Sequence, residues 1–566
     1  MQRKLLSIAS IVVVSMLLAS CGGAATPAAT VAPAATVAPA ATVAPAATEA
    51  PAATEAPAPV TVTIFVPQDP NRDMATNAFS LLLEEKFNVK FEWTTTTYDG
   101  NSAREKRNLA LASGDYPMTF MLIPWIDQFT PLDVLRYGQQ GVLIPLNDLI
   151  DQYAPNIQAA LDENDMFRAM AVAPDGNIYG LPQLIECYHC SFGNKMWINT
   201  KWLNELGLSM PATTEDFRAV LEAFKTQDPN GNGTADEVPL SGAIMDYGTR
   251  PIPFLMNGFI YDDDRTYLYM NEGRVDIVAN KPEWREGLAY IKSLYDAGLI
   301  DPGAFTNNAE AYSALGNNAD AELLGCAAGM HPAIFVNCFG EEADKPYCYD
   351  YDPLPPLQGP HAGYSTYIPN MVPGATFVLT NKATPEAQIA MIQIVDYMFT
   401  FEGRMNGIFG TKGINWRDPE PGELANNQSV EPLYAVIPNS PVNNSWGAGA
   451  QYWDTVANRD AWVQSPDIYT DEGYEHRLLL ATDLYNGKES PDLFPFWAVW
   501  PDLARADEVS MQRTNIVDYV NQNALAFVTG SKDLDTDWDA YVQGLDGLGF
   551  ADYLASMQES YDATFR

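Results

Sequence analysis

Strand-like and helix-like stretches alternate near the start of the chain, and this alternation constrains the fold more than any other feature. The strand-like stretches, rich in β-branched, aromatic and apolar residues, are 59–67, 89–98 and 118–124. The stretches with helical character that separate them are 75–88 and 103–115. Repeated strand–helix units favour an α/β layered fold with parallel strands.

Later segments continue this pattern and then depart from it. Residues 374–380 are strand-like, and residues 385–403 carry apolar side chains at helical spacing. Residues 425–500 are rich in Asn, Pro and Trp and show no clear periodicity. Residues 535–562 predict two amphipathic helices with a break near Gly547–Gly549.

The first 21 residues have the organisation of an export signal. A basic start is followed by about fifteen mostly apolar residues, too few for a comfortable membrane span. Leu18-Ala19-Ser20-Cys21 resembles the bacterial lipobox, in which the cysteine is lipidated and becomes the first residue of the mature protein. We therefore expect a signal peptide at 1–20 and a lipid anchor at Cys21 on the cell membrane, with an ordinary secretory signal as the alternative.

Residues 25–59 repeat a six-residue Pro/Ala/Thr unit. Such a tract cannot bury enough apolar surface to fold, and proline biases it toward extended conformations. A tether of ~35 residues at polyproline rise would reach up to ~100 Å. The sequence thus predicts a disordered tether at 21–59 and a folded body that starts near Val60.

Charge and motifs narrow the functional classes. The net charge is −40, from 72 acidic and 32 basic residues, which argues against binding to nucleic-acid phosphates. The chain has no G-x-S-x-G elbow, H-E-x-x-H pair or P-loop, and its acids form no recognisable glycosidase motif. We expect a binding protein and no enzyme, with an exported glycoside hydrolase as the less favoured alternative.

Lipidation of Cys21 would leave five cysteines, an odd number, so at least one is free or pairs between molecules. They are Cys187, Cys190, Cys326, Cys338 and Cys348. The C-x-x-C of "CYHC" could be half of a zinc site, but the chain has no second C-x-x-C and only four histidines. A local disulfide or free thiols are favoured, and the pairing stays open.

Six stretches, in chain order, carry a family resemblance. They are 141–157 (GVLIPLNDLIDQYAPNI), 173–182 (APDGNIYGLP), 199–233 (NTKWLNELGLSMPATTEDFRAVLEAFKTQDPNGNG), 294–302 (LYDAGLIDP), 352–360 (DPLPPLQGP) and 526–549 (AFVTGSKDLDTDWDAYVQGLDGLG). Together they resemble the extracellular solute-binding proteins of bacterial ABC importers, in the branch that binds large carbohydrates such as alginate oligosaccharides.

The resemblance implies a two-lobed α/β periplasmic-binding-protein-like fold that holds its ligand in a cleft between the lobes. It implies an N-terminal lobe of residues 60–186 plus 353–424 and a C-terminal lobe of residues 187–352 plus 425–566. It also implies a function: capture of a carbohydrate outside the membrane and delivery to the permease subunits of an ABC transporter. A receptor for a peptide or another non-sugar solute is the alternative.

Residues 228–237, DPNGNGTADE, have the spacing of the front half of an EF-hand, with Gly233 at position 6 and Pro239 at position 12, where a glutamate is expected. From the residues alone, a broken EF-hand, a chance cluster of turn residues and a different calcium site all stay open. In the alginate-binding relatives a loop of this pattern holds calcium. The resemblance therefore implies a structural Ca²⁺ with these ligands: Asp228, Asn230, Asn232, Thr234 (through its carbonyl), Asp236 and Glu237.

Sugar binding needs aromatic faces that stack on pyranose rings and polar groups that pair with hydroxyls. The chain has 12 tryptophans and 28 tyrosines, most of which should serve packing. Better candidates follow predicted strands, lie at the expected lobe crossing or occupy the irregular aromatic stretch. They are Trp125, Asp127, Gln183, Glu186, Tyr188, Asn444, Trp446 and Trp453, with His331 as a weaker one.

Overall fold

The computed structural model describes residues 58–245, 247–339, 346–369 and 374–565. The chain divides into two units, Met1–Pro57 and Ala58–Arg566, and the second contains all the described residues. The expected signal peptide, Cys21 and residues 21–57 of the expected tether lie outside the described residues. Among the described helices, none combines the length and the hydropathy that crossing a membrane requires.

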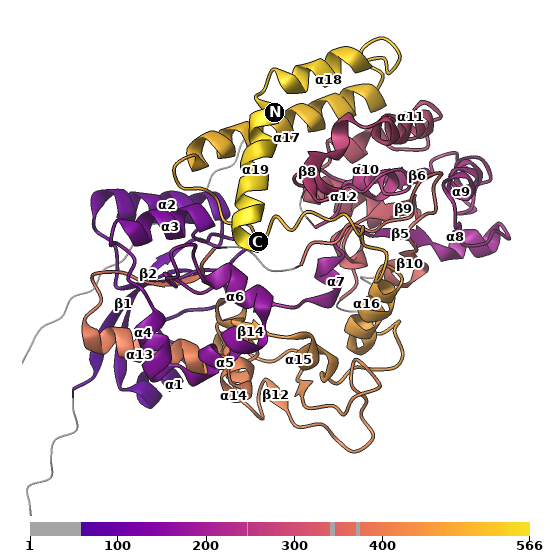
Figure 1. Cartoon of the computed structure of the whole chain (residues 1–566). Helices are drawn as coiled ribbons and strands as arrows, with labels where there is room; N and C mark the ends of the chain where they lie inside the picture. The colour runs from indigo at the N-terminus through magenta and orange to yellow at the C-terminus, as the bar shows by residue number, and fades with distance from the viewer. Residues whose placement is uncertain (1–57, 246, 340–345, 370–373, 566) are drawn as a thin grey trace, which may run out of the picture. The chain divides into compact units, whose positions relative to one another are not determined.

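The first sheet has the strand order β11-β3-β1-β2, and its strands β1 and β2 are labelled in Figure 1. Its strands are β1 (Val60–Pro67), β2 (Val89–Thr96), β3 (Thr119–Met121) and β11 (Phe377–Leu379). β1 runs parallel to β2 and β3, as the alternation predicts, whereas β11 is antiparallel to β3. The expectation of parallel strands is therefore wrong for β11, which belongs to a late segment that returns to the sheet after the second sheet has formed.

Helices pack around this sheet on a core of side chains from its strands. They are α1 (Ala78–Phe87), α2 (Gly100–Ser113), α3 (Pro131–Gln139), α4 (Asn147–Tyr153), α5 (Pro155–Glu163), α6 (Asp165–Ala171), α13 (Pro385–Met398) and α14 (Phe401–Ile408). The single helix expected at 385–403 is two helices, because the Thr400 hydroxyl accepts a hydrogen bond from the Gly403 N–H and starts α14 as its N-cap.

The second sheet has the order β10-β5-β9-β6. Its strands are β5 (Met196–Asn199), β6 (Val238–Ser241), β9 (Leu324–Ala328) and β10 (Tyr351–Leu354). β6 is parallel to β9, while β5 is antiparallel to both β9 and β10. The carboxyl ends of β6 and β9 and the start of β5 therefore lie at one edge of this sheet.

A larger set of helices and one hairpin accompanies the second sheet. The elements are α8 (Thr200–Glu205), α9 (Thr214–Thr226), α10 (Pro251–Met256), β7 (Leu268–Asn271), β8 (Arg274–Ile277), η1 (Val278–Asn280), α11 (Pro282–Asp296), η2 (Pro302–Phe305), α12 (Ala309–Gly316), η3 (Pro332–Ile334) and η5 (Cys348–Asp350). The helices α17 (Ala506–Val528), α18 (Trp538–Asp546) and α19 (Phe550–Phe565) close the chain. The last two confirm the helix pair expected with a break near Gly547–Gly549.

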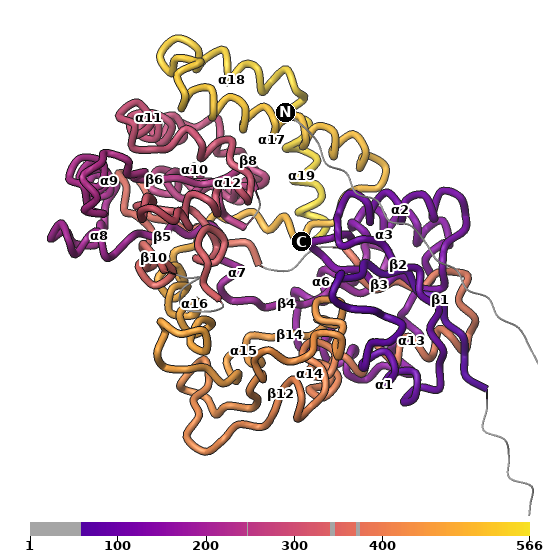
Figure 2. Tube along the Cα trace, turned by 180° about the vertical axis from the view of Figure 1, so that it is seen from behind, coloured from indigo at the N-terminus to yellow at the C-terminus, as the bar shows by residue number. Residues whose placement is uncertain are grey.

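Between the two sheet regions the chain crosses on β4 (Leu184–Ile185), which pairs in parallel with β14 (Trp453–Asp454) (Figures 1 and 2). The stretch 425–500, which lacks periodicity, contains short elements and one regular helix. They are β13 (Ala435–Val436), η6 (Val442–Asn444), η7 (Gly447–Ala450), α15 (Val456–Asp460), η8 (Asp471–Gly473) and α16 (Tyr474–Asp483), with β12 (Trp416–Arg417) paired to β13. Trp446, Ala450 and Tyr452 pack in the core of the first sheet, although the sequence places everything after 425 with the second lobe.

Candidate functional site

The carboxyl ends of β1, β2 and β3 lie at one edge of the first sheet, where open α/β sheets bind ligands. The segments that follow these strands place Asp69, Tyr98 and Trp125 at that edge. A pocket there is lined by Asp69, Arg72, Tyr98 and, from the irregular stretch, Trp446. This edge is therefore the first wall of the candidate site.

Trp125 and Tyr98 form the aromatic part of this wall. Trp125 is 48% exposed, although it is a large apolar side chain. Its indole N–H is a donor only, so it donates to the Tyr98 hydroxyl. Burial raises the pKa of Tyr98, with a smaller opposing effect from the Trp125 hydrogen bond. The pair presents a fixed aromatic surface to solvent.

A charged pair lies beside the aromatic pair. Arg72 forms an ion pair with Asp69 and donates from Nε to the Ser445 carbonyl at 3.1 Å. Both charged side chains are about a fifth exposed, and the pocket next to them is lined mostly by apolar groups. They offer hydrogen-bond donors and acceptors next to the aromatic surface of Tyr98.

The second wall is the loop that follows β6. Tyr247 is 49% exposed and has a φ of +72°, which is uncommon for a bulky residue and marks a backbone held by its surroundings. Its carbonyl accepts a hydrogen bond from the Met330 N–H at 2.8 Å. The next residue, Gly248, lies so close to Gly193 that a Cβ would be 2.0 Å from the Gly193 carbonyl oxygen. Main-chain contacts therefore hold the backbone from which the Tyr247 side chain extends.

The two walls are close enough to interact. The Tyr247 hydroxyl contributes, together with Asp69, to raising the pKa of Tyr98, after the larger effect of burial. Tyr247 also borders a second pocket, lined by Arg250, Asp262, Asp264 and apolar side chains. Arg250 is paired with Asp264 at 2.6 Å, and burial raises the pKa of Asp264 to about 6. Each wall therefore combines a half-exposed aromatic ring, Trp125 or Tyr247, with an ion pair beside it.

Of the eight residues that the sequence singles out as ligand contacts, Trp125 is the one with a largely open face. Trp446 is 5% exposed and donates from Nε1 to the Ser80 hydroxyl at 2.9 Å. Trp453 stacks on Phe399 with ring centroids 5.7 Å apart. Both rings are used in packing on the first sheet, and Trp446 also borders the first pocket.

The polar candidates have protein partners. The contacts are Asp127 with Arg107 (2.6 and 3.1 Å), Gln183 Nε2 to the Ala448 carbonyl (2.9 Å), the Val456 N–H to Glu186 Oε2 (2.8 Å), the Tyr188 hydroxyl to Asp483 (3.0 Å) and Asn444 Nδ2 to Asn415 Oδ1 (2.9 Å). Asp127 and Gln183 are each 2% exposed. Trp125 and Tyr98 come together in the structure, whereas these five stay at separate contacts.

Four residues of the two walls are absent from the ligand contacts expected from the sequence: Asp69, Arg72, Tyr98 and Tyr247. Tyr98 ends the second predicted strand and could have been found by the rule that placed Trp125. Tyr247 carries no comparable signal, because the close contact between Gly248 and Gly193 joins two segments that are distant in sequence.

The loop 228–237 is held together by hydrogen bonds among its own polar groups. Asp228 accepts from the N–H groups of Asn232 and Gly233, both at 3.1 Å. Asn230 and Asn232 turn their amides toward Asp236, at 3.1–3.2 Å. Glu237 Oε1 is buried and has no hydrogen-bond partner among the described residues. Burial raises the pKa of Glu237, and the charges of Asp228 and Asp236 raise it further.

The cysteines form two local disulfides, Cys187–Cys190 and Cys338–Cys348, and leave Cys326 buried and free. The sequence left a local disulfide and free thiols both open for "CYHC", and the structure has the disulfide. That bridge joins Cys187, the N-cap of α7 (Tyr188–Ser191), to Cys190 inside the helix, shortly after the crossing strand β4. Burial lowers the pKa of His189, inside the bridge, with a smaller contribution from Lys195. Burial also lowers the pKa of the neighbouring His331 to about 4.

The chain is similar to known proteins along most of its length. It is 30% identical over 510 residues to the fructooligosaccharide ABC transporter substrate-binding protein FusA of Streptococcus pneumoniae, covering 88% of each chain. It is 25% identical over 370 residues to the lipoprotein LipO of Bacillus subtilis, covering 63% of this chain and 67% of LipO.

Solved structures give the same result. FusA in complex with kestose matches with a TM-score of 0.67 and 27% identity, covering 89% of this chain and 99% of FusA. A FusA EF-hand mutant in complex with fructo-nystose matches with the same values. The sequence model of the bacterial extracellular solute-binding proteins matches residues 72–400. The chain therefore belongs to the family of bacterial extracellular solute-binding proteins.

Proposed function

We propose that the protein captures an oligosaccharide outside the cell membrane and delivers it to the permease of an ABC transporter. The observation that carries this proposal is the aromatic surface made by Trp125, Tyr98 and Tyr247: Trp125 and Tyr247 are each about half exposed, and both affect the pKa of Tyr98. The similarity to FusA, a fructooligosaccharide-binding protein by name, supports the same class of ligand.

The surface suits a sugar better than a peptide. Aromatic faces stack on the apolar faces of pyranose or furanose rings, and planar charged groups pair with hydroxyls. Asp69 and Arg72 on one wall and Arg250 and Asp264 on the other supply such groups beside the rings. Because each charged group already has an opposite partner, the site offers hydrogen bonds to a neutral ligand without an unpaired charge.

We propose that the two sheet regions act as lobes that close on the ligand, with the boundaries expected from the sequence as a first approximation. The crossing pair β4–β14 is short and lies between the two sheets, as a hinge requires (Figure 2). The expected second lobe begins again at residue 425. Three later residues pack on the first sheet instead, so we place the return of the chain to the second lobe after β14; they are Trp446, Ala450 and Tyr452.

We also propose that the loop 228–237 holds a structural calcium ion. The donor set fits, because calcium takes six to eight oxygens and the loop provides three carboxylates and two amide oxygens. The buried, unpartnered Glu237 Oε1, facing the charges of Asp228 and Asp236, is the feature that a bound cation would explain. Asp228, Asn230, Asn232, Asp236 and Glu237 would hold the ion with the Thr234 carbonyl, and the ion would fix the loop that follows α9.

Membrane anchoring through Cys21 remains part of the proposal. It rests on the lipobox-like sequence and on the similarity to LipO, a lipoprotein by name. A tethered receptor would collect ligand and dock on the permease without leaving its neighbourhood. Cys21→Ala should release the protein from membranes or block its processing, and a soluble wild-type protein with an unmodified Cys21 would contradict the anchor.

A thermal-shift screen tests the function. A ligand that binds only the folded state raises the melting temperature by mass action. We expect shifts with oligosaccharides, including kestose, and none with peptide pools. Shifts with peptides alone would replace the sugar receptor by a peptide receptor, and chromatographic detection of cleaved glycan would instead support the hydrolase.

A further inference from the structure

The disulfide Cys187–Cys190 encloses a histidine whose surroundings match those of a metal ligand. His189 Nε2 lies 3.3 Å from Cys187 Sγ, and the ligand atoms of Cys187, His189 and Cys190 all lie within 4.8 Å of one another. Two sulfurs and one imidazole nitrogen at these separations are the donors that zinc and other thiophilic divalent cations prefer. In the oxidised protein the sulfur–sulfur bond occupies this position.

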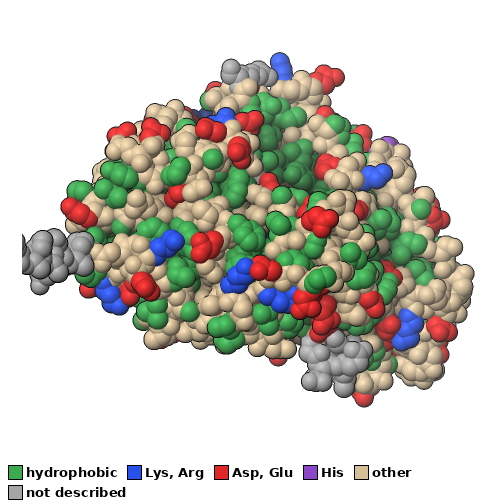
Figure 3. Space-filling view, turned by 90° about the horizontal axis from the view of Figure 1, so that it is seen from below, with side chains coloured by type: hydrophobic (Ala, Val, Ile, Leu, Met, Phe, Trp, Pro, Cys, Tyr) green, Lys and Arg blue, Asp and Glu red, His purple; other side chains and the backbone are tan. Residues whose placement is uncertain are grey.

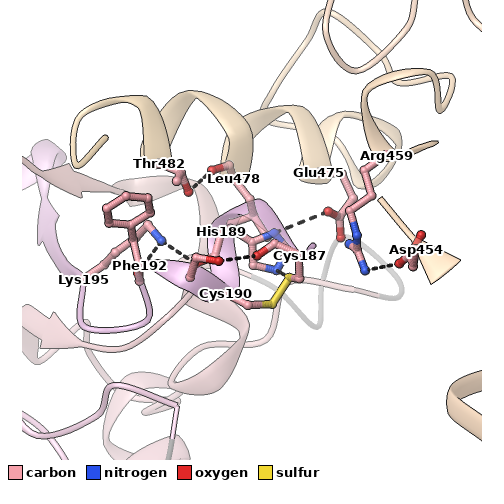
Figure 4. Close-up of a disulfide and its surroundings, with 11 residues drawn as sticks. Cys187, His189, Cys190, Phe192, Lys195, Asp454, Arg459, Glu475, Leu478 and Thr482 are labelled. Atoms are coloured by element: carbon pink, nitrogen blue, oxygen red, sulfur yellow. Dashed lines mark hydrogen bonds and ion pairs between the residues drawn. A yellow bond between two sulfur atoms is a disulfide. The ribbon is translucent and has the colours of Figure 1, made fainter. Parts of the chain in front are cut away.

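The second ring nitrogen supplies an independent observation. His189 Nδ1 lies 3.7 Å from the Glu475 carboxylate on α16, and Figure 4 shows the ring directed toward Glu475 with the disulfide beside it. A metal-bound histidine characteristically points one nitrogen at the metal and the other at a carboxylate, which fixes the tautomer and raises the basicity of the ligand. His189 has this orientation already, with sulfur on one side and carboxylate on the other.

Two basic side chains lie near the bridge, and two of its three proposed ligands are partly exposed. Lys195 donates from Nζ to the His189 and Phe192 carbonyls, at 2.8 and 2.6 Å, and Arg459 pairs with Asp454 at 2.6 Å close to Glu475 (Figure 4). Cys187 is buried, while His189 and Cys190 are partly exposed, which leaves a path for an ion from solvent.

We propose that reduction of the Cys187–Cys190 disulfide creates a Zn²⁺ site made of Cys187, His189 and Cys190, with Glu475 as the residue that positions His189. A water-soluble phosphine performs the reduction in a balanced step: phosphorus takes the oxygen of one water, and the two protons of that water go to the two sulfurs. Zinc then displaces both thiol protons. Three protein ligands leave a fourth position for water. The site lies next to β4 in the chain, so zinc would bind beside the segment that crosses between the two sheets.

Zinc titration of the full chain, oxidised and phosphine-reduced, tests the proposal with excess calcium present to fill oxygen sites. We expect one additional equivalent of zinc in the reduced protein alone, and a sulfur-to-metal charge-transfer band when Co²⁺ replaces zinc. The comparison uses unaltered protein, so it does not depend on whether a variant folds. Equal zinc binding in both redox states, or none in the reduced state, overturns the proposal.

Variants locate the site within the chain. Cys187→Ser with Cys190→Ser should abolish the extra equivalent and the band, whereas Cys338→Ser with Cys348→Ser should retain both. Glu475→Gln should weaken zinc binding by about 10- to 100-fold, the usual cost of losing a carboxylate that supports a ligating histidine. The matched change His361→Gln, at an exposed histidine paired with Glu286, should leave the affinity unchanged. Zinc binding that survives the loss of Cys187 and Cys190 contradicts the assignment.

Discussion

The loop 228–237 and the aromatic surface are the two proposed binding regions, one polar and one largely apolar, and they differ in how they are assembled. All the oxygens of the loop come from ten consecutive residues, 228–237, whereas the aromatic surface joins Tyr98, Trp125 and Tyr247 from three segments. The loop can form its contacts as soon as α9 ends. The aromatic surface exists only after both sheets have formed, so its geometry depends on the whole fold.

The two regions also differ in what surrounds them. Acidic side chains are scattered over the face seen in Figure 3 instead of forming a single patch. In the loop, however, three acids lie together, and the electrostatic cost of that cluster is the reason to expect a cation. At the aromatic surface Asp69 is paired with Arg72 and Asp264 with Arg250, which is the reason to expect a neutral ligand.

The largest effect should come from replacing Trp446, the buried ring that borders the first pocket. Trp446→Ala removes a ring that is 5% exposed and contacts Phe79 and Trp93 edge to face. It should lower the free energy of unfolding by about 3–5 kcal/mol, measured by denaturant titration without ligand. Trp125→Ala, at a half-exposed ring, is the control and should change it by less than about 0.5 kcal/mol. A Trp446→Ala protein of normal stability that has lost only sugar binding would assign this ring to the ligand instead.

Removal of calcium should have the next largest effect. A ligand present at about 100 times its Kd stabilises the folded state by about 2.7 kcal/mol, so a chelator should lower the melting temperature. Asp228→Ala should abolish that response, while Asp115→Ala, at an exposed acid outside the loop, should preserve it. Elemental analysis should find one calcium per chain. If the protein contains no calcium and its melting temperature does not respond to the chelator, the loop 228–237 is an ordinary turn without a metal.

Calcium affinity should also depend on pH. Burial and the neighbouring acids raise the pKa of Glu237, so its carboxylate becomes protonated at a higher pH than an ordinary glutamate. Protons compete with the ion for this ligand, and affinity should fall as the pH is lowered through that raised pKa. Glu237→Gln should flatten the dependence in calcium titrations at several pH values. An unchanged profile would remove Glu237 from the ligand set.

At the aromatic surface itself, Trp125→Ala should weaken oligosaccharide binding by about 1–2 kcal/mol, roughly tenfold, since one stacking face is lost. Titration calorimetry measures the change. Phe565→Ala, at another exposed aromatic ring, is the matched control and should bind normally. Equal affinities for wild type and Trp125→Ala would place the ligand elsewhere.

The smallest effect should follow from Tyr98→Phe. The substitution keeps the ring and removes the hydroxyl that accepts from Trp125, a loss of about 0.5–1.5 kcal/mol in binding if that bond fixes the Trp125 face. Tyr469→Phe, which removes a hydroxyl bonded to Asp352, is the control. A loss larger than that of Trp125→Ala would show that the hydroxyl, and not the stacked face, dominates recognition.

The sequence predicted those parts of the molecule in which neighbouring residues decide the structure. The first strands and helices follow the alternation of residues 59–124, and the break between α18 and α19 follows from Gly547–Gly549. The residues of the loop 228–237 could likewise be picked out because they are close in the chain, whereas the pairing of Cys187 with Cys190 stayed open until the structure was seen.

The parts that were missed depend on distant contacts. β11 is antiparallel because of where its segment returns, and α16 was hidden in an aperiodic stretch because its Arg477 and His476 are buried and paired with distant carbonyls. Trp446 and Trp125 are both aromatic residues in turn-rich segments, and only the packing of the first sheet distinguishes the buried ring from the exposed one.

Small-angle X-ray scattering, with and without the oligosaccharide that gives the largest thermal shift, tests the central claim most directly. If the two sheet regions close on a sugar held between Trp125 and Tyr247, the radius of gyration must fall when the sugar is added. The Trp125→Ala protein should need roughly ten times more sugar for the same decrease. A radius of gyration that stays constant at saturating sugar would contradict closure on an oligosaccharide.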